Sequence, residues 1–103
     1  MKIYMLEPGK DLRSMVVAND LKLLQDLVGG YLEAFSIQGG PVNTILLCDE
    51  EGKLKGKQPN IMIPGDVIVG TVLFVGSDHR GEFVDCPMSR DEILAKIRRC
   101  VTL

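Results

Sequence analysis

The chain has 103 residues, of which 46% are hydrophobic and 25% are charged, and its formal net charge is −2. These values are ordinary for one globular domain, so we expect residues 1–103 to form a single domain with its own core. Because the net charge is slightly negative and the basic residues are spread along the chain, the composition argues against nucleic-acid binding.

The sequence offers no pattern typical of a membrane, metal or redox protein. Its longest apolar run is shorter than a bilayer crossing needs, and the N-terminus lacks an export signal, so we expect a cytoplasmic protein without a membrane partner. The three cysteines are far apart and form no C-x-x-C pair, which argues against a disulfide framework and a zinc site. No metal or cofactor is therefore assigned.

The first half of the chain predicts a hairpin, a helix and two strands. Residues 1–6 and 12–18 are apolar runs on either side of a Pro-Gly turn, which is a hairpin signal. Residues 19–30 begin with Asn-Asp, carry leucines at helical spacing and end in Gly-Gly, so they predict a short amphipathic helix. Strands are expected at residues 31–37 and 43–48, with Glu33 on the same face as Tyr31 and Phe35. The ordinary interpretation of Glu33 is an edge position paired with a lysine or arginine.

A charged loop follows, in which three acidic residues at 49–51 precede lysines at 53, 55 and 57. Its lysines could hold a phosphate, or its carboxylates a ribose hydroxyl. The alternative is an ordinary solvated surface loop. The glycine spacing matches neither of the common nucleotide-binding motifs, so the sequence supplies no nucleotide motif.

Residues 60–76 contain the most apolar stretch, and we expect residues 67–75 to form one central strand covered on both faces. Pro64 and Gly65 have the chemistry of a type II turn that begins this strand, and Asp66 is a candidate cap of the turn. Gly70 lies within the run, where a missing side chain indicates a bulge or the close approach of another backbone or a ligand.

The C-terminal part predicts a loop at 76–81, a strand at 82–86 and a well-specified helix. His79 lies in that loop, where a solvated side chain is the simpler interpretation than a general base. Ser89 and Glu92 form a capping-box pattern, with Met88 and Ile93 placed as a hydrophobic staple. The helix is expected to continue beyond residue 100, with basic residues toward its C-terminus and this buried stripe: Ile93, Leu94, Ile97, Val101.

Together these elements predict an α+β fold with two helices packed on a mainly antiparallel sheet of about five to seven strands. The expected order along the chain is β-β-α-β-β-β-β-α. Unprotected hairpin edges favour a homodimer that pairs or covers them.

Four segments resemble one known family: EPGK at 7–10, NDLKLLQDLVGGYLE at 19–33, CDEEGKLKG followed by PN within 48–60, and GDVIVGTVLFVG at 65–76. They are similar, in order and spacing, to the domain-of-unknown-function family 3846. The resemblance implies a small protein of bacteriophages and bacterial mobile elements, without an established enzymatic activity. By analogy with other small phage proteins, it implies a role in the conflict with host defence.

Two function hypotheses follow, neither of them enzymatic, because no catalytic set of side chains is visible. The first is a binding module that sequesters a small nucleotide-type signal on glycines and nearby polar groups. Its candidate ligand-binding residues are these: Tyr31, Glu33, Asn60, Gly65, Asp66, Gly70. The alternative is a protein-interaction domain that inhibits or recruits a host or phage protein through a sheet edge or helix face.

Overall fold

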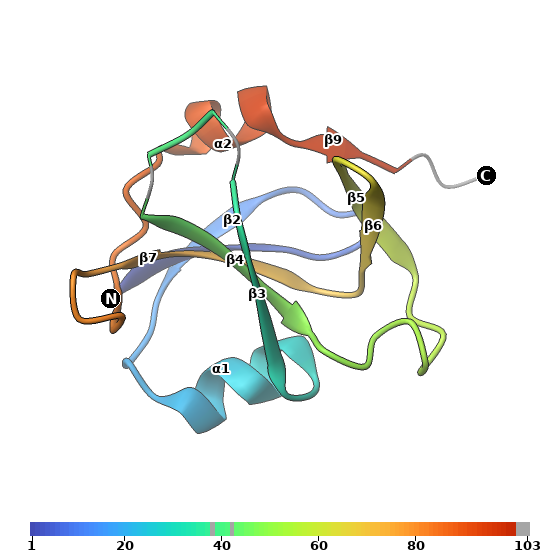
Figure 1. Cartoon of the computed structure of the whole chain (residues 1–103), viewed down its shortest axis with the longest axis horizontal. Coiled ribbons are helices and arrows are strands. Elements are labelled where there is room, and N and C mark those ends of the chain that lie inside the picture. The colour runs from blue at the N-terminus through green and yellow to red at the C-terminus, as the bar shows by residue number, and fades with distance from the viewer. Residues whose placement is uncertain (38, 42, 101–103) are drawn as a thin grey trace.

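The computed structural model describes residues 1–37, 39–41 and 43–100, and in them nine strands and two helices form an α+β fold (Figure 1). Every strand pair is antiparallel, as expected. The elements, in chain order, are β1 (Lys2–Leu6), β2 (Arg13–Val16), α1 (Leu21–Val28), β3 (Leu32–Ser36), β4 (Thr44–Asp49), β5 (Pro59–Ile63), β6 (Asp66–Val69), β7 (Val72–Ser77), β8 (Phe83–Val84), α2 (Arg90–Lys96) and β9 (Arg98–Arg99).

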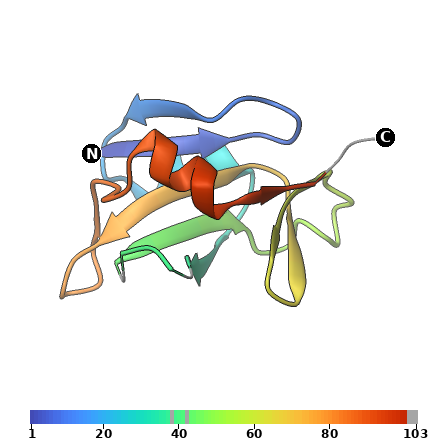
Figure 2. The same ribbon diagram turned by 90° about the horizontal axis from the view of Figure 1, so that it is seen from above.

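The larger sheet separates two hydrophobic cores. Its strand order is β2-β1-β7-β4-β3, with β8 also paired to β7, while the smaller sheet has the order β6-β5-β9. Helix α1 lies against one face of the larger sheet, and α2 and the smaller sheet lie over the other (Figures 1 and 2). Alternation in the central strand β7 sends Leu73 and Val75 to the α1 side and Val72 and Phe74 to the opposite core. Both faces of β7 are therefore covered, which explains its apolar run from Val72 to Val75.

The expectation of one strand across residues 67–75 was wrong. Gly70 adopts φ +75°, a left-handed conformation, and the chain turns there from β6 in the smaller sheet to β7 at the centre of the larger one. The backbone N–H of Gly70 donates to the carbonyl of Gln58 at 2.8 Å, which anchors this corner. Gly70 is therefore a junction between the two sheets rather than a bulge within one strand.

The ends of α1 agree with the sequence prediction. The Asp20 side chain accepts a hydrogen bond from the backbone N–H of Lys22, and Gly29 ends the helix with φ 85°. Neither helix in the described part of the chain is long and apolar enough to cross a membrane.

The start of α2 was predicted correctly, whereas its end was not. Ser89 and Glu92 form the capping box, but the helix stops at Lys96 and Ile97 is extended. Arg98 and Arg99 then pair with β5 as strand β9, so they do not extend the helix. The expected stripe is accordingly interrupted: Leu94 is 42% exposed. Val101 lies outside the described residues. Pairing with β5 supplies the backbone hydrogen bonds that a further helical turn would have supplied locally. The chain therefore forms strand β9 instead of extending α2.

Candidate binding site

Two of the predicted site residues, Asn60 and Gly70, lie together inside the protein. The Asn60 side chain is buried, and its Nδ2 donates to the carbonyls of Leu6 and Gly70, each at 2.8 Å. These hydrogen bonds join the smaller sheet to the end of β1 and to the Gly70 corner. Because both donor hydrogens are already used, the amide serves as a link between sheets.

Gly65 and Asp66 form the turn between β5 and β6, far along the hairpin from that buried amide. Gly65 has φ +77°, as the expected turn requires. The Asp66 carboxylate accepts a hydrogen bond from the N–H of Val67 at 2.7 Å and forms an ion pair with Lys53. The Lys53 hydrogen bond lowers the pKa of Asp66 from its usual range. Asp66 therefore caps the turn at the start of β6, which is the structural role considered for it in the sequence.

The charged loop after β4 holds an ion-pair cluster, so the alternative of an ordinary solvated loop does not hold for Asp49. This residue is only 4% exposed, and its Oδ2 lies 2.8 Å from the Nζ of Lys55 and 2.7 Å from that of Lys57. Both ammonium groups also donate to carbonyls at the end of α1: Lys57 to Val28 at 2.7 Å and Lys55 to Gly29 at 3.0 Å. Cations are favourable at a helix C-terminus.

The protonation of Asp49 reflects this cluster. Burial by itself raises the pKa of the carboxyl, but the hydrogen bonds from Lys55 and Lys57 outweigh it and lower the pKa to about 2. The carboxylate therefore stays ionised and holds the loop against α1. The lysines that could have bound a phosphate are occupied within the protein, because Lys53 is paired with Asp66 as well.

The remaining predicted residues, Tyr31 and Glu33, open onto different hollows. Tyr31 is 67% exposed beside a wide hollow of about 620 Å³ that Lys22, Gly29 and Lys55 also line. Glu33 lines a smaller hollow of about 200 Å³ with Glu50 and Asp66. The expected pairing of Glu33 with a lysine or arginine is absent among the described residues. The six predicted residues thus lie at separate places instead of forming one site.

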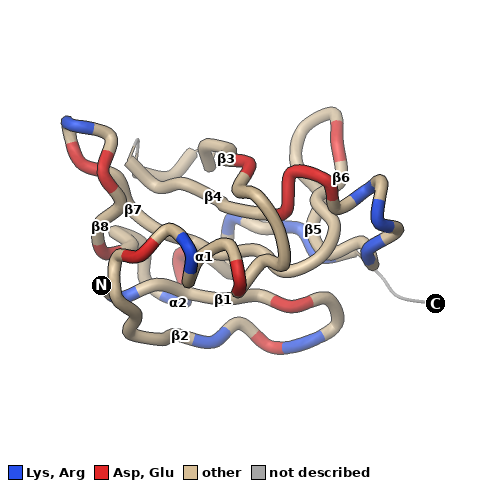
Figure 3. Tube along the Cα trace, turned by 90° about the horizontal axis from the view of Figure 1, so that it is seen from below, with Lys and Arg blue, Asp and Glu red and all other residues tan. Residues whose placement is uncertain are grey.

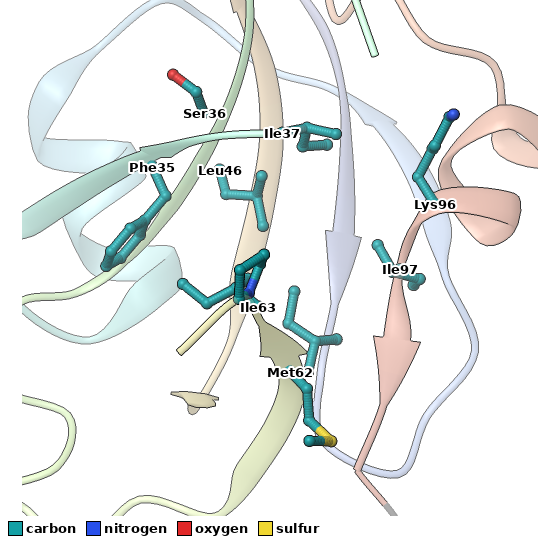
Figure 4. A pocket seen from close by; sticks show the side chains of 10 residues that line it. Phe35, Ser36, Ile37, Leu46, Met62, Ile63, Lys96 and Ile97 are labelled. Atoms are coloured by element: carbon teal, nitrogen blue, oxygen red, sulfur yellow. The ribbon is translucent and has the colours of Figure 1, made fainter. Parts of the chain in front are cut away.

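A third hollow, which the sequence did not predict, is an apolar groove of about 330 Å³ between the two sheets (Figure 4). Its wall on the larger sheet includes Phe35 and Ile37, and its far wall is formed by β5 and the end of α2. Lys96 is the charged side chain that lines the groove. The residues lining it are Phe35, Ser36, Ile37, Leu46, Ile61, Met62, Ile63, Pro64, Lys96 and Ile97. No local pattern signals it, because its walls come from segments that lie far apart in the sequence.

The groove runs beside β3, which is an edge strand, since its described pairing partner is β4 alone. The hydrogen bonds from Glu50 N to Tyr31 O at 2.8 Å and from Ile37 N to Thr44 O at 3.5 Å fix the phase of this ladder. In an antiparallel pair, alternate residues direct their backbone groups to the partner strand and away from it. The residues that direct N–H and C=O away from β4 are therefore Leu32, Ala34 and Ser36.

Comparison with known families agrees with the sequence resemblance. Residues 1–98 match the family described as a domain of unknown function (DUF3846), and the chain belongs to that family. No curated protein and no solved structure matches the chain.

Proposed function

We propose that this member of the DUF3846 family is a binding module that captures an extended segment of a partner protein along β3. One observation carries the proposal: β3 is an edge strand whose outward backbone groups pair with no other described strand, and it runs beside an apolar groove of about 330 Å³. An added strand would gain main-chain hydrogen bonds from Leu32, Ala34 and Ser36. Its alternate side chains would lie on the face of Phe35 and Ile37, over the groove.

The physical chemistry favours such an occupant over a compact ligand. Unpaired edges of sheets are templates for a further strand, and proteins that do not use an edge protect it with proline, inward charges or a covering loop. Strand β3 contains no proline, and its outward positions are a leucine, an alanine and a serine; its one charged residue, Glu33, lies on the face of Phe35. In a bacterium that carries a phage or mobile element, the setting implied by the resemblance, such capture would block or recruit a host or phage protein.

The proposal is tested by selecting binders from a displayed library of short random peptides, using three forms of the protein. Ala34→Pro removes an outward N–H of β3 without touching the ladder to β4, because edge positions of this kind tolerate proline. Ser14→Pro is the matched control, since Ser14 faces outward on β2, the opposite edge, by the same ladder phase.

Peptides selected on the unmodified protein should bind Ser14→Pro equally well and lose at least about tenfold in affinity for Ala34→Pro. Thermal melting of both variants establishes that they are folded. Peptides that bind Ala34→Pro undiminished, or a library that yields none, would refute capture along β3.

A second candidate function, sequestration of a small nucleotide-type ligand, is favoured by the hollow beside Tyr31. An exposed aromatic ring next to Gly29 and Gly30 is suited to stacking on a base, and Lys22 lies near enough to line the same hollow. Lys22 is paired with Asp26, however, so a phosphate would have to compete with a carboxylate. Cyclic and ADP-ribose-type nucleotides should then raise the melting temperature of the unmodified protein and not that of Tyr31→Ala. Absence of a shift with every nucleotide rejects this candidate.

A further inference from the structure

The apolar groove and the small acidic hollow meet at Phe35, which lines both. Along this face of β3, side chains alternate, so Ile37, Phe35 and Glu33 follow one another on the same side. Lys96 lines the groove together with Ile37, and Glu50 lines the acidic hollow together with Glu33. Along the length of β3, the side chains on and beside this face therefore change from a cation, through apolar residues, to carboxylates.

The charges at the two ends are not neutralised by their surroundings. Lys96, Glu33 and Glu50 form no ion pair with any residue that the structure describes. The other charged side chains that line the acidic hollow are paired: Asp66 with Lys53, and Asp49 with Lys55 and Lys57. Figure 3 shows acidic positions on β3, at the end of β4 and at the start of β6 on one side of the molecule. An occupant that brings opposite charges to both ends would complete these pairs.

The spacing of these groups fits an extended peptide. Residues 33 and 35 of β3 and residue 37 just after it lie two apart, so their neighbours on an added strand are also two apart, at about 6.6 Å from one to the next. All strand pairs described in this protein are antiparallel. An antiparallel addition would start at the Lys96 end and finish at the Glu33 end.

From this complementarity we infer which segment the site recognises, an inference that rests on the proposed capture along β3. The partner segment reads, from its N-terminus, acidic, any residue, apolar, any residue, basic. The acidic side chain lies beside Lys96, the apolar one enters the groove next to Phe35, and the basic one lies between Glu33 and Glu50. The charges select the direction and register of the segment, while the backbone edge and the groove supply affinity that does not depend on its charges.

The test uses the peptides selected from the displayed library and a charge-swapped protein, Lys96→Glu with Glu33→Lys. Both side chains are exposed, so the double variant should fold, which circular dichroism and thermal melting verify. Two synthetic probes of equal composition complete the set: Thr-Glu-Thr-Val-Thr-Arg-Thr and its reversed sequence. The protein control is Lys10→Glu with Glu82→Lys, an exposed swap away from the groove at residues that pair with Glu7 and Arg80.

We expect the selected peptides to carry the acidic-apolar-basic order and the forward probe to bind at least about fivefold more tightly than the reversed probe. The charge-swapped protein should invert this preference, and the control swap should leave it unchanged. Selected peptides that lose binding to Ala34→Pro but show no charge order, or keep the same order on the charge-swapped protein, would overturn the inference and leave capture along β3 standing. Peptides indifferent to Ala34→Pro would instead overturn the proposed function itself.

Discussion

Replacing Asp49 with asparagine removes the carboxylate charge with which Lys55 and Lys57 pair beside the end of α1. The pKa of Asp49 falls from its ordinary value of 3.8 to about 2 in the folded protein. A folded-state pKa below the unfolded value means that the carboxylate adds stability above pH 4, and that this stability is lost as pH falls toward 2. The shift corresponds to about 2 kcal/mol at neutral pH and to about half of that at pH 3.

This expectation is checked by urea unfolding of the unmodified protein and of Asp49→Asn at several pH values between 2 and 7. Other carboxyl groups titrate in the same range, so the informative quantity is the difference in unfolding free energy between the two proteins. That difference should be about 2 kcal/mol at pH 7 and should shrink steadily below pH 4.

The matched control is Asp66→Asn, which also removes a carboxylate from a lysine pair. The Asp66 side chain is 43% exposed against 1% for Asp49, so solvent screens its pair and its loss should cost far less. A difference for Asp49→Asn that does not vary with pH, or that merely equals the difference for Asp66→Asn, would show that the buried cluster does not stabilise the fold electrostatically.

Three further variants test the links within the fold by urea unfolding. Asn60→Ala leaves two buried carbonyls without their donor and should cost about 2–4 kcal/mol. The control Asn19→Ala removes an exposed amide that donates one hydrogen bond to a carbonyl, and it should cost about 0.5 kcal/mol or less. Equal losses would contradict a stabilising role for the buried Asn60 hydrogen bonds. Gly70→Ala should cost about 1–3 kcal/mol, because φ +75° disfavours a side chain and the new Cβ would lie 2.8 Å from Cδ of Lys57. An unchanged unfolding free energy would contradict the left-handed turn at Gly70. Ser89→Ala should cost about 1 kcal/mol through loss of the capping box, and no change would mean that the helix start is held by packing alone.

Local chemistry made several elements predictable. The capping box at Ser89, the glycine stop at Gly29 and the Pro64-Gly65 turn each depend on groups a few residues apart, and each is present. The family was also recognisable, because its segments keep their order along the chain. The α+β class follows from these elements and from the periodicity between them.

The features that were mispredicted depend on contacts between distant segments. An apolar run with one glycine is equally compatible with a single strand and with two strands, and only the packing of two sheets decides for a corner at Gly70. The end of α2 is likewise decided by pairing with β5. In the sequence, Asp49 is one of three consecutive acidic residues and nothing distinguishes it from the other two. Only the folded structure shows its buried ion pairs with Lys55 and Lys57 beside α1. The groove is lined by β3, β5 and Lys96, and no spacing in the sequence predicts that these segments lie side by side.

Amide hydrogen exchange at β3, measured by NMR with and without a library-selected peptide, tests the central claim most directly. In the free protein the outward amides of Ala34 and Ser36 should exchange quickly, while that of Phe35, bonded to β4, should be protected. Addition of the peptide should slow exchange at Ala34 and Ser36 by at least about tenfold. Protection that appears instead at Ser14 on β2, or exchange at β3 that the bound peptide leaves unchanged, would contradict capture of a partner strand along this edge.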